Sequence, residues 1–168
     1  LQHNTAAVNL YKSSGFEISR EFGCYVCDDL GKLTIKKIDT NYTISEIDIR
    51  EIEDFSSCFD FEPSWQNSFD SIKRARREFK FKKCSIDAID AGFIAFEPES
   101  GDIAQLAVKS EHRRLGVASM LLQSAVQEIT CGKIKIINVE CGSEPLEEFC
   151  TKSGLQLVCK QYEMILDL

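Results

Sequence analysis

Hydrophobic residues between positions 103 and 132 follow two patterns in succession. Ile103–Val108 is a short apolar run of the kind found in buried strands. Beyond a basic turn, apolar side chains recur at helical spacing, at Ala118, Leu121, Leu122, Ala125 and Ile129. This order predicts a strand, a turn and an amphipathic helix that ends at Gly132.

Similar segments alternate along residues 39–168. Further strands are predicted at Tyr42–Ile47, Lys83–Ile89, Gly92–Phe96, Lys133–Val139 and Leu155–Leu168, the last as a strand or a hairpin. Helical segments are predicted between Ile49 and Phe81 and at Pro145–Lys152. The alternation is typical of a mixed α/β (α+β) fold, in which helices flank a central mixed β-sheet.

The first 38 residues predict a helix followed by two strands. The helix covers Thr5–Ser13 and is closed by Gly15. The strands cover Phe16–Cys27 and Lys32–Ile38, with a turn between them. A helix and a hairpin are too small to bury a core alone, so we expect them to dock on the rest of the chain or on a second chain.

Composition narrows the classes of function. At 168 residues, with 43% hydrophobic and 28% charged residues, the chain fits one globular core. A net charge of −7 and a pI near 4.9 disfavour a nucleic-acid partner. The basic stretch Lys73–Lys83 could form a nucleic-acid patch, but a solvated helix face is the simpler interpretation. We find no apolar run of membrane-spanning length and no signal peptide, and we expect a segment of a longer protein with no membrane partner.

Eight cysteines are mostly scattered singly among apolar residues, and one CxxC occurs, at Cys24–Cys27. A structural zinc site needs four ligands, and the two histidines, His3 and His112, do not supply the missing pair. Buried free thiols in a reducing, cytoplasmic compartment are the better interpretation, with no metal site.

The turn between strand and helix has the chemistry of an anion site. Gly116 lets the backbone approach a ligand closely, and the first helical turn offers unpaired N–H groups and a favourable dipole. Arg113 and Arg114 add positive charge. The sequence therefore predicts a binding site for a pyrophosphate group.

Two motifs resemble those of the GCN5-related N-acetyltransferase (GNAT) superfamily. Arg113-x-x-Gly116-x-Ala118, after a strand that ends Leu106-Ala107-Val108, resembles the acyl-coenzyme A signature of the family. The segment Ser143-x-x-Leu146-x-x-Phe149-Cys150-x-x-x-Gly154-Leu155 resembles the family's Asn-x-x-Ala-x-x-Leu-Tyr-x-x-x-Gly-Phe, although Cys150 replaces the tyrosine.

The resemblance implies the GNAT fold and an acetyl-coenzyme A-dependent N-acetyltransferase that modifies a primary amine of a small molecule, peptide or protein. In the family, the neighbour of the signature strand splays away and leaves backbone groups free for the coenzyme. The coenzyme-binding residues implied are Leu106, Ala107, Val108, Arg113, Arg114, Leu115, Gly116, Val117, Ala118 and Ser119.

Candidate catalytic roles follow from the same resemblance. The backbone N–H of Leu106 would stabilise the oxyanion. Asp102 lies four residues earlier, on the same face of a regular strand, and is either a catalytic base or a surface turn residue. Glu140 is a weaker base candidate, and Gln105 is expected only to hydrogen-bond.

The catalytic acid is left open. Cys150 could protonate the leaving thiolate, or it could be a small core residue, with Tyr162 as a substitute acid. Without an acid, the chain would be a catalytically inactive acyl-coenzyme A-binding or scaffolding module. An aromatic cluster either lines the acceptor pocket or belongs to the core. Its members are Phe55, Phe59, Phe61, Trp65 and Phe69.

The second motif occurs twice. Asn4-x-x-Ala7-x-x-Leu10-Tyr11-x-x-x-Gly15-Phe16 also matches the family segment, and 143 minus 4 and 154 minus 15 both give an offset of 139. That spacing is about one domain. We therefore expect residues 1–38 to be the C-terminal remnant of a preceding GNAT domain and residues 39–168 to be a complete one. A homodimer or strand exchange through the remnant is the expected association.

Overall fold

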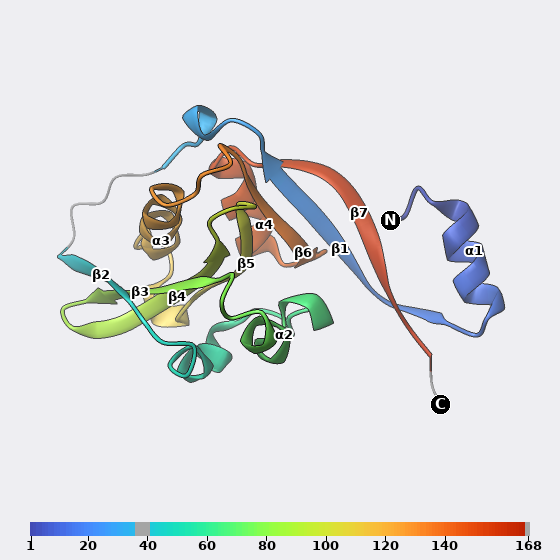
Figure 1. Cartoon of the computed structure of the whole chain (residues 1–168), viewed down its shortest axis with the longest axis horizontal. Coiled ribbons are helices and arrows are strands. Elements are labelled where there is room, and N and C mark those ends of the chain that lie inside the picture. The colour runs from blue at the N-terminus through green and yellow to red at the C-terminus, as the bar shows by residue number, and fades with distance from the viewer. Residues whose placement is uncertain (36–40, 167–168) are drawn as a thin grey trace.

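The computed structural model describes residues 1–35 and 41–166 (Figure 1). Its helices are α1 (Thr5–Ser13), α2 (Phe69–Arg74), α3 (Val117–Val126) and α4 (Glu144–Lys152). Its strands are β1 (Glu17–Cys27), β2 (Tyr42–Glu46), β3 (Lys80–Ile86), β4 (Ile89–Glu97), β5 (Asp102–Val108), β6 (Ile134–Glu140) and β7 (Gln156–Ile165). Short 3-10 helices lie at η1 (Leu30–Lys32), η2 (Ile52–Cys58), η3 (Trp65–Asn67) and η4 (Ser110–His112).

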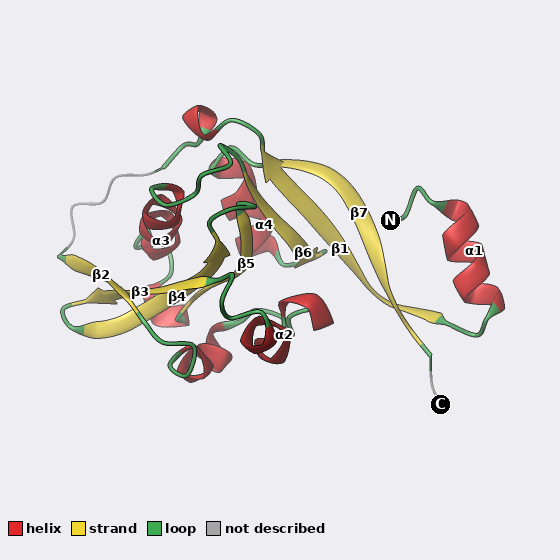
Figure 2. Ribbon diagram, viewed as in Figure 1, coloured by secondary structure: helices red, strands yellow, loops and turns green. Residues whose placement is uncertain are grey.

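The described strands form one sheet in the order β2-β3-β4-β5-β6-β1-β7. Neighbours are antiparallel except β5 and β6, which are parallel. Figure 2 shows helices on both sides of this sheet. The mixed sheet flanked by helices that the sequence predicts is confirmed.

Each face of the sheet has its own core. On one face, Leu121 and Leu122 of α3 and Cys150 of α4 pack in a buried cluster with side chains of β4 and β6. On the other face, Phe55 of η2 and Ile72 of α2 pack in a second cluster with side chains of β3, β4 and β5. The apolar stripe of α3 therefore faces a core as its spacing predicts, although the helix ends at Val126, before Gly132.

The predicted amino-terminal hairpin is wrong in the part that the structure describes. Residues 32–35 form no strand, and the rest of the predicted Lys32–Ile38 strand lies outside the described residues. Strand β1 instead lies between β6 and β7 and pairs antiparallel with both. Two partners satisfy both backbone edges of β1, whereas a local hairpin would satisfy one.

Candidate functional site

Strands β5 and β6 diverge almost as soon as they begin. The register pair between them in the described residues is Asp102 with Lys135, at their starts. A cavity of about 440 Å³ opens beyond this pair and is lined by β5, β6, the turn before α3, part of α4 and the loop at residues 58–63. The divergence leaves one edge of β5 free for a ligand, as expected from the family resemblance.

The cavity brings together nine of the ten predicted coenzyme-binding residues. They are Leu106, Ala107, Val108, Arg113, Arg114, Gly116, Val117, Ala118 and Ser119. Leu115 is not among the lining residues, and its side chain is exposed. Residues that the sequence proposes for one ligand therefore surround one cavity.

The turn before α3 has an unusual backbone. Arg114 and Gly116 both have positive φ, at 63° and 85°, and Gly116 is the N-cap of α3 without any side-chain hydrogen bond. Its carbonyl accepts the N–H of Met120, so the N–H groups of Val117, Ala118 and Ser119 have no partner within the helix. Unpaired donors at a helix start, beside a left-handed residue, are an arrangement that can bind an anion.

The two arginines of the turn differ in how freely they can reach a ligand. Arg113 pairs with Asp60 at 2.7 Å and donates to the carbonyls of Val108 and Cys58 at 3.2 and 3.3 Å. Arg114 is largely exposed and pairs with Glu148 at 3.0 Å. An exposed pair contributes little to stability, so Arg114 can turn to a phosphate at low cost, whereas Arg113 fixes the loop at 58–63.

A buried glutamine spans the opening between the diverging strands. The Nε2 of Gln105 donates to the carbonyl of Asn67 at 2.7 Å, and the Nδ2 of Asn67 donates to the carbonyl of Ile137 at 3.1 Å. Both residues line the cavity. The Oε1 of Gln105 is buried and has no hydrogen-bond partner among the described residues. It is an acceptor that an N–H group of a ligand could satisfy.

A second polar chain lies beside the cavity and was not predicted. Asn138 of β6 has a φ of 62°, lines the cavity, donates to Gln66 at 3.0 Å and accepts from Gln161. A non-glycine residue with this φ inside a strand is uncommon and marks local strain. The sequence offers one signal for it, since asparagine tolerates this conformation better than other residues do.

Asp102 is placed at the closed end of the diverging strands. It pairs with Lys135 at 3.4 Å, and it is not among the residues that line the cavity. Its Oδ1 is buried and has no hydrogen-bond partner in the described part of the chain. Burial raises the pKa of the carboxyl, and Lys135 partly opposes this shift. The role of Asp102 as a base stays a prediction.

The expectation that Asp102 shares a face with Leu106 is wrong. The pairing of β4 with β5 shifts between Gln105 and Ile103, which leaves Ala104 as an extra residue. Ile103 and Leu106 consequently face the same core, which strict two-residue alternation would forbid. The bulge therefore breaks the alternation on which the expectation depended.

Cys150 is fully buried on the inner side of α4. Its exposed fraction is 0%, it does not line the cavity, and burial raises the pKa of its thiol to about 12. These properties favour the core interpretation of this residue. Tyr162, the substitute acid, does not line the cavity either, so an acid role stays a prediction for both.

The aromatic cluster divides between core and cavity. Phe55 is buried and packs on Phe93, with ring centroids 5.0 Å apart. Phe59 and Phe61 line the cavity, and Trp65 is 70% exposed. The core interpretation therefore holds for Phe55, and the acceptor-pocket interpretation stays a prediction for the residues that line the cavity.

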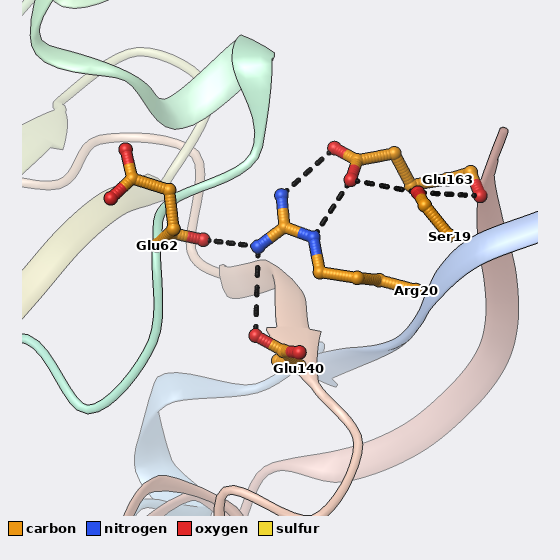
Figure 3. A network of polar contacts seen from close by, with 5 residues as sticks. All are labelled: Ser19, Arg20, Glu62, Glu140 and Glu163. Carbon is orange, nitrogen blue, oxygen red and sulfur yellow. Dashed lines mark hydrogen bonds and ion pairs between the residues drawn. The ribbon is translucent and has the colours of Figure 1, made fainter. Parts of the chain in front are cut away.

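Arg20 joins β1 to the edge of this site (Figure 3). Its guanidinium donates to both carboxylate oxygens of Glu163 on β7, at 2.7 and 3.0 Å, and lies 3.5 Å from Glu140 on β6. It also donates to the carbonyl of Glu62, in the loop whose residues Phe61 and Pro63 line the cavity. One side chain therefore fixes three elements, and Glu140, the weaker base candidate, is engaged in this network.

Comparison with known proteins identifies the family. Residues 48–154 match the Acetyltransferase (GNAT) family. This match covers more than half of the chain and includes the divergent strands and the turn, and the protein belongs to the GNAT family. A search of curated proteins finds no match.

Solved structures resemble the fold of nearly the whole chain. A Drosophila protein aligns over 99% of it with a TM-score of 0.71 and 12% identity. A tandem GNAT protein from the clavulanic acid biosynthesis pathway aligns over 96%, with a TM-score of 0.68 and 13% identity. A GCN5-related N-acetyltransferase from Kribbella flavida aligns over 94%, with a TM-score of 0.64 and 13% identity. At these identities the likeness concerns the fold alone, and the chain spans 58%, 57% and 62% of the three structures.

Residues 1–35 and 41–166 contain neither a membrane-spanning helix nor a metal-binding cluster. None of the helices there is long and apolar enough to cross a membrane. No group of three or more histidine, cysteine or acidic side chains there is arranged to hold a metal ion. All eight cysteines are free thiols.

Proposed function

We propose that the chain binds acetyl-coenzyme A in the cavity between β5 and β6 and transfers the acetyl group to a primary amine of a small molecule, peptide or protein. The observation that carries this proposal is the convergence of nine predicted coenzyme-binding residues on one cavity of about 440 Å³. Membership of the GNAT family supports the same class of reaction. The eight free thiols support a reducing, cytoplasmic compartment.

The proposed mechanism depends on backbone groups more than on side chains. The N–H groups of Val117, Ala118 and Ser119 would bind the pyrophosphate, and the free edge of β5 would align the pantetheine arm. The acceptor amine would attack the thioester carbonyl, and the N–H of Leu106 would stabilise the negative charge that develops on its oxygen. The bond to sulfur then breaks, and coenzyme A leaves as a thiolate.

Calorimetric titration with acetyl-coenzyme A, followed by mass spectrometry of a panel of amines, tests this function. We expect a dissociation constant in the micromolar range and an acetylated product for at least one class of amine. Absence of binding would reject the proposal. Binding without product would favour a catalytically inactive acyl-coenzyme A-binding or scaffolding module, an alternative supported by the buried Cys150 where the family segment has a tyrosine.

Asp102 is the proposed base, and its place at the closed end of the strands requires an intervening water for proton transfer. We expect Asp102→Asn to lower kcat by about 100-fold, the lower range for general base catalysis, and to leave acetyl-coenzyme A affinity unchanged. Steady-state kinetics and calorimetry measure the two effects separately. Glu140→Gln provides the comparison, and a loss of turnover in this variant alone would transfer the role to Glu140.

We also propose that residues 1–38 end a preceding GNAT domain and that residues 39–168 form a complete one. The Drosophila and clavulanic acid pathway structures support this division, because they match 99% and 96% of the chain while the chain spans 58% and 57% of them. The second of these is described as a tandem GNAT protein. Sequencing the full transcript and expressing its whole product tests the division.

A further inference from the structure

The two ends of the chain have nearly identical local structures. Helices α1 (Thr5–Ser13) and α4 (Glu144–Lys152) begin and end at positions that differ by 139, and the strands that follow begin at Glu17 and Gln156, again 139 apart. The loops between them match too, since Gly15 and Gly154 have φ values of 89° and 90°. The repeat seen in the sequence is therefore a structural repeat of a helix, a turn and a strand.

Hydrogen bonds repeat with the same offset across the two strands. The N–H of Gln2 donates to the carbonyl of Lys160 at 2.9 Å, and the N–H of Cys141 donates to the carbonyl of Glu21 at 2.8 Å. Gln2 and Cys141 are 139 residues apart, and so are Glu21 and Lys160. Each bond is the equivalent of the other, with the roles of the two strands exchanged.

The pairing of β1 with β7 places a pseudo-two-fold axis at the centre of both strands. Phe22 pairs with Gln161, which is its own equivalent at the offset of 139. The pairs Arg20–Glu163 and Cys24–Cys159 lie on either side and exchange under the same operation. An axis of this kind is the geometry of an isologous interface between two similar units.

On one side of this axis the outer strand edge is paired with another strand, and on the other side it lies at the edge of the described sheet. The carboxyl half of β1, from Phe22 to Cys27, pairs with β6. The equivalent segment is Gln161–Leu166, which comprises the carboxyl half of β7 and the residue after it. This half of β7 lies at the outer edge of the described sheet, and Ile165 and Leu166 are 49% and 39% exposed. Figure 1 shows α1 at the far end of the β1–β7 ribbon, away from the other helices.

Side chains of α1 and the turn after it are more exposed than their equivalents in α4 and the turn after that helix. Cys150 of α4 is 0% exposed, whereas its equivalent in α1, Tyr11, is 49% exposed. Leu155 is 2% exposed, whereas its equivalent Phe16 is half-buried. Phe149 packs against the large core, whereas its equivalent Leu10 is 64% exposed. The apolar face of α1 has the composition of a core helix without the core.

We propose that the open half of β7 and the apolar face of α1 bind a second GNAT unit of the same polypeptide, which continues the sheet through the pseudo-two-fold axis. This interface, formed by Gln161–Leu166 and α1, rests on the domain organisation proposed above and specifies how the two units would pack. The strand of that unit equivalent to β6 pairs antiparallel with Gln161–Leu166, and the offset places its last residue, the equivalent of Glu140, at Leu1. The unit buries Leu10 and Tyr11 as the complete domain buries Phe149 and Cys150.

Hydrogen–deuterium exchange compares the full natural polypeptide with residues 1–168 alone. We expect the backbone amides of Gln161–Ile165 that point away from β1 to exchange at least 100-fold more slowly in the full polypeptide. Amides of β1 between β6 and β7 are the internal control and should be protected in both. Protection of the edge in residues 1–168 that rises with their own concentration would identify a second copy as the occupant and overturn the proposal.

Two further outcomes distinguish failure of the proposed interface from failure of the proposed domain organisation. A full polypeptide that contains a second GNAT unit and still leaves the edge of β7 in fast exchange would overturn the interface alone. A full polypeptide without such a unit would overturn both.

Substitutions in α1 test the burial of its apolar face. Tyr11→Ser is expected to lower the melting temperature of the full polypeptide by about 5 °C or more. The decrease in residues 1–168 alone should be clearly smaller, because Tyr11 is 49% exposed there and its main aromatic contact is Phe16, with ring centroids 5.4 Å apart. Lys12→Ser is the matched control, because Lys12 and its equivalent Thr151 are both exposed. Equal effects of the two substitutions in the full polypeptide would contradict the proposed burial of α1.

Discussion

Replacing Gly116 with valine is expected to lower the affinity for acetyl-coenzyme A by at least 100-fold. Gly116 has a φ of 85°, a conformation that costs a branched side chain about 1–3 kcal/mol. The turn would relax away from it and carry along the N–H groups of Val117, Ala118 and Ser119. A loss of about 2.7 kcal/mol in binding free energy corresponds to 100-fold, and calorimetric titration measures it directly.

Gly132→Val is the matched control for backbone strain. Gly132 has a φ of 73°, and a Cβ placed on it would meet no atom of residues 1–35 and 41–166 within 4 Å. Valine there therefore adds comparable strain without reaching the cavity. We expect its affinity for acetyl-coenzyme A to equal that of the parent. If Gly116→Val binds as tightly as the parent, or if both variants lose the same affinity, the turn before α3 is not the anion site.

The turn could be recognised from sequence because its chemistry is local. A strand, a glycine and a helix start follow one another within 20 residues, and each has its own signal in residue type or spacing. The same is true of α1, whose observed bounds, Thr5–Ser13, equal those predicted. Local periodicity specifies an element even where its surroundings differ, as the exposed α1 and the partly buried α4 show.

The partners of β1 could not be predicted, because strand pairing is a non-local choice. Residues 17–27 have the composition of a strand, and a turn at 28–31 favours a hairpin with the next segment. The structure instead places β1 in the gap between β6 and β7, over 100 residues away in sequence. Which strand edges are available to β1 depends on how the whole sheet assembles, and a local sequence pattern carries no information about this.

The side chains around the cavity were predicted less well than its backbone. The bulge at Ala104 reverses the faces of β5 on either side of it, so an argument from alternation fails between Asp102 and Leu106. The polar chain through Asn67 and Asn138 depends on η3 and β6 meeting across the opening. Both features arise from tertiary contacts that spacing does not encode.

Replacing Arg20 with methionine is expected to lower the free energy of unfolding by about 2 kcal/mol at pH 7. The side chains of Arg20 and Glu163 are 21% and 18% exposed, so the variant leaves a largely buried carboxylate without its bidentate partner. It also removes a donor from the carbonyl of Glu62, beside the cavity. Urea unfolding of the parent and the variant measures the difference.

The difference should depend on pH in a defined direction. The hydrogen bond from Arg20 lowers the pKa of Glu163 in the folded state. A carboxylate with a lowered folded pKa stabilises the protein fully above its unfolded pKa, about 4.3, and this stabilisation is lost as pH falls through the folded pKa. The difference in unfolding free energy between parent and Arg20→Met is therefore largest near pH 7, narrows as pH falls and closes below about pH 4.

Arg50→Met separates the buried network from ion pairing in general. The Nε of Arg50 lies 2.8 Å from the Oδ1 of Asp48, but the two side chains are 86% and 50% exposed. We therefore expect this variant to lower the free energy of unfolding by less than about 0.5 kcal/mol. Burial, rather than the distance between the charged atoms, then accounts for the larger effect at Arg20. Equal losses in the two variants, or a gap at Arg20 that widens at low pH, would show that the contacts drawn in Figure 3 do not stabilise the junction of β1, β6 and β7.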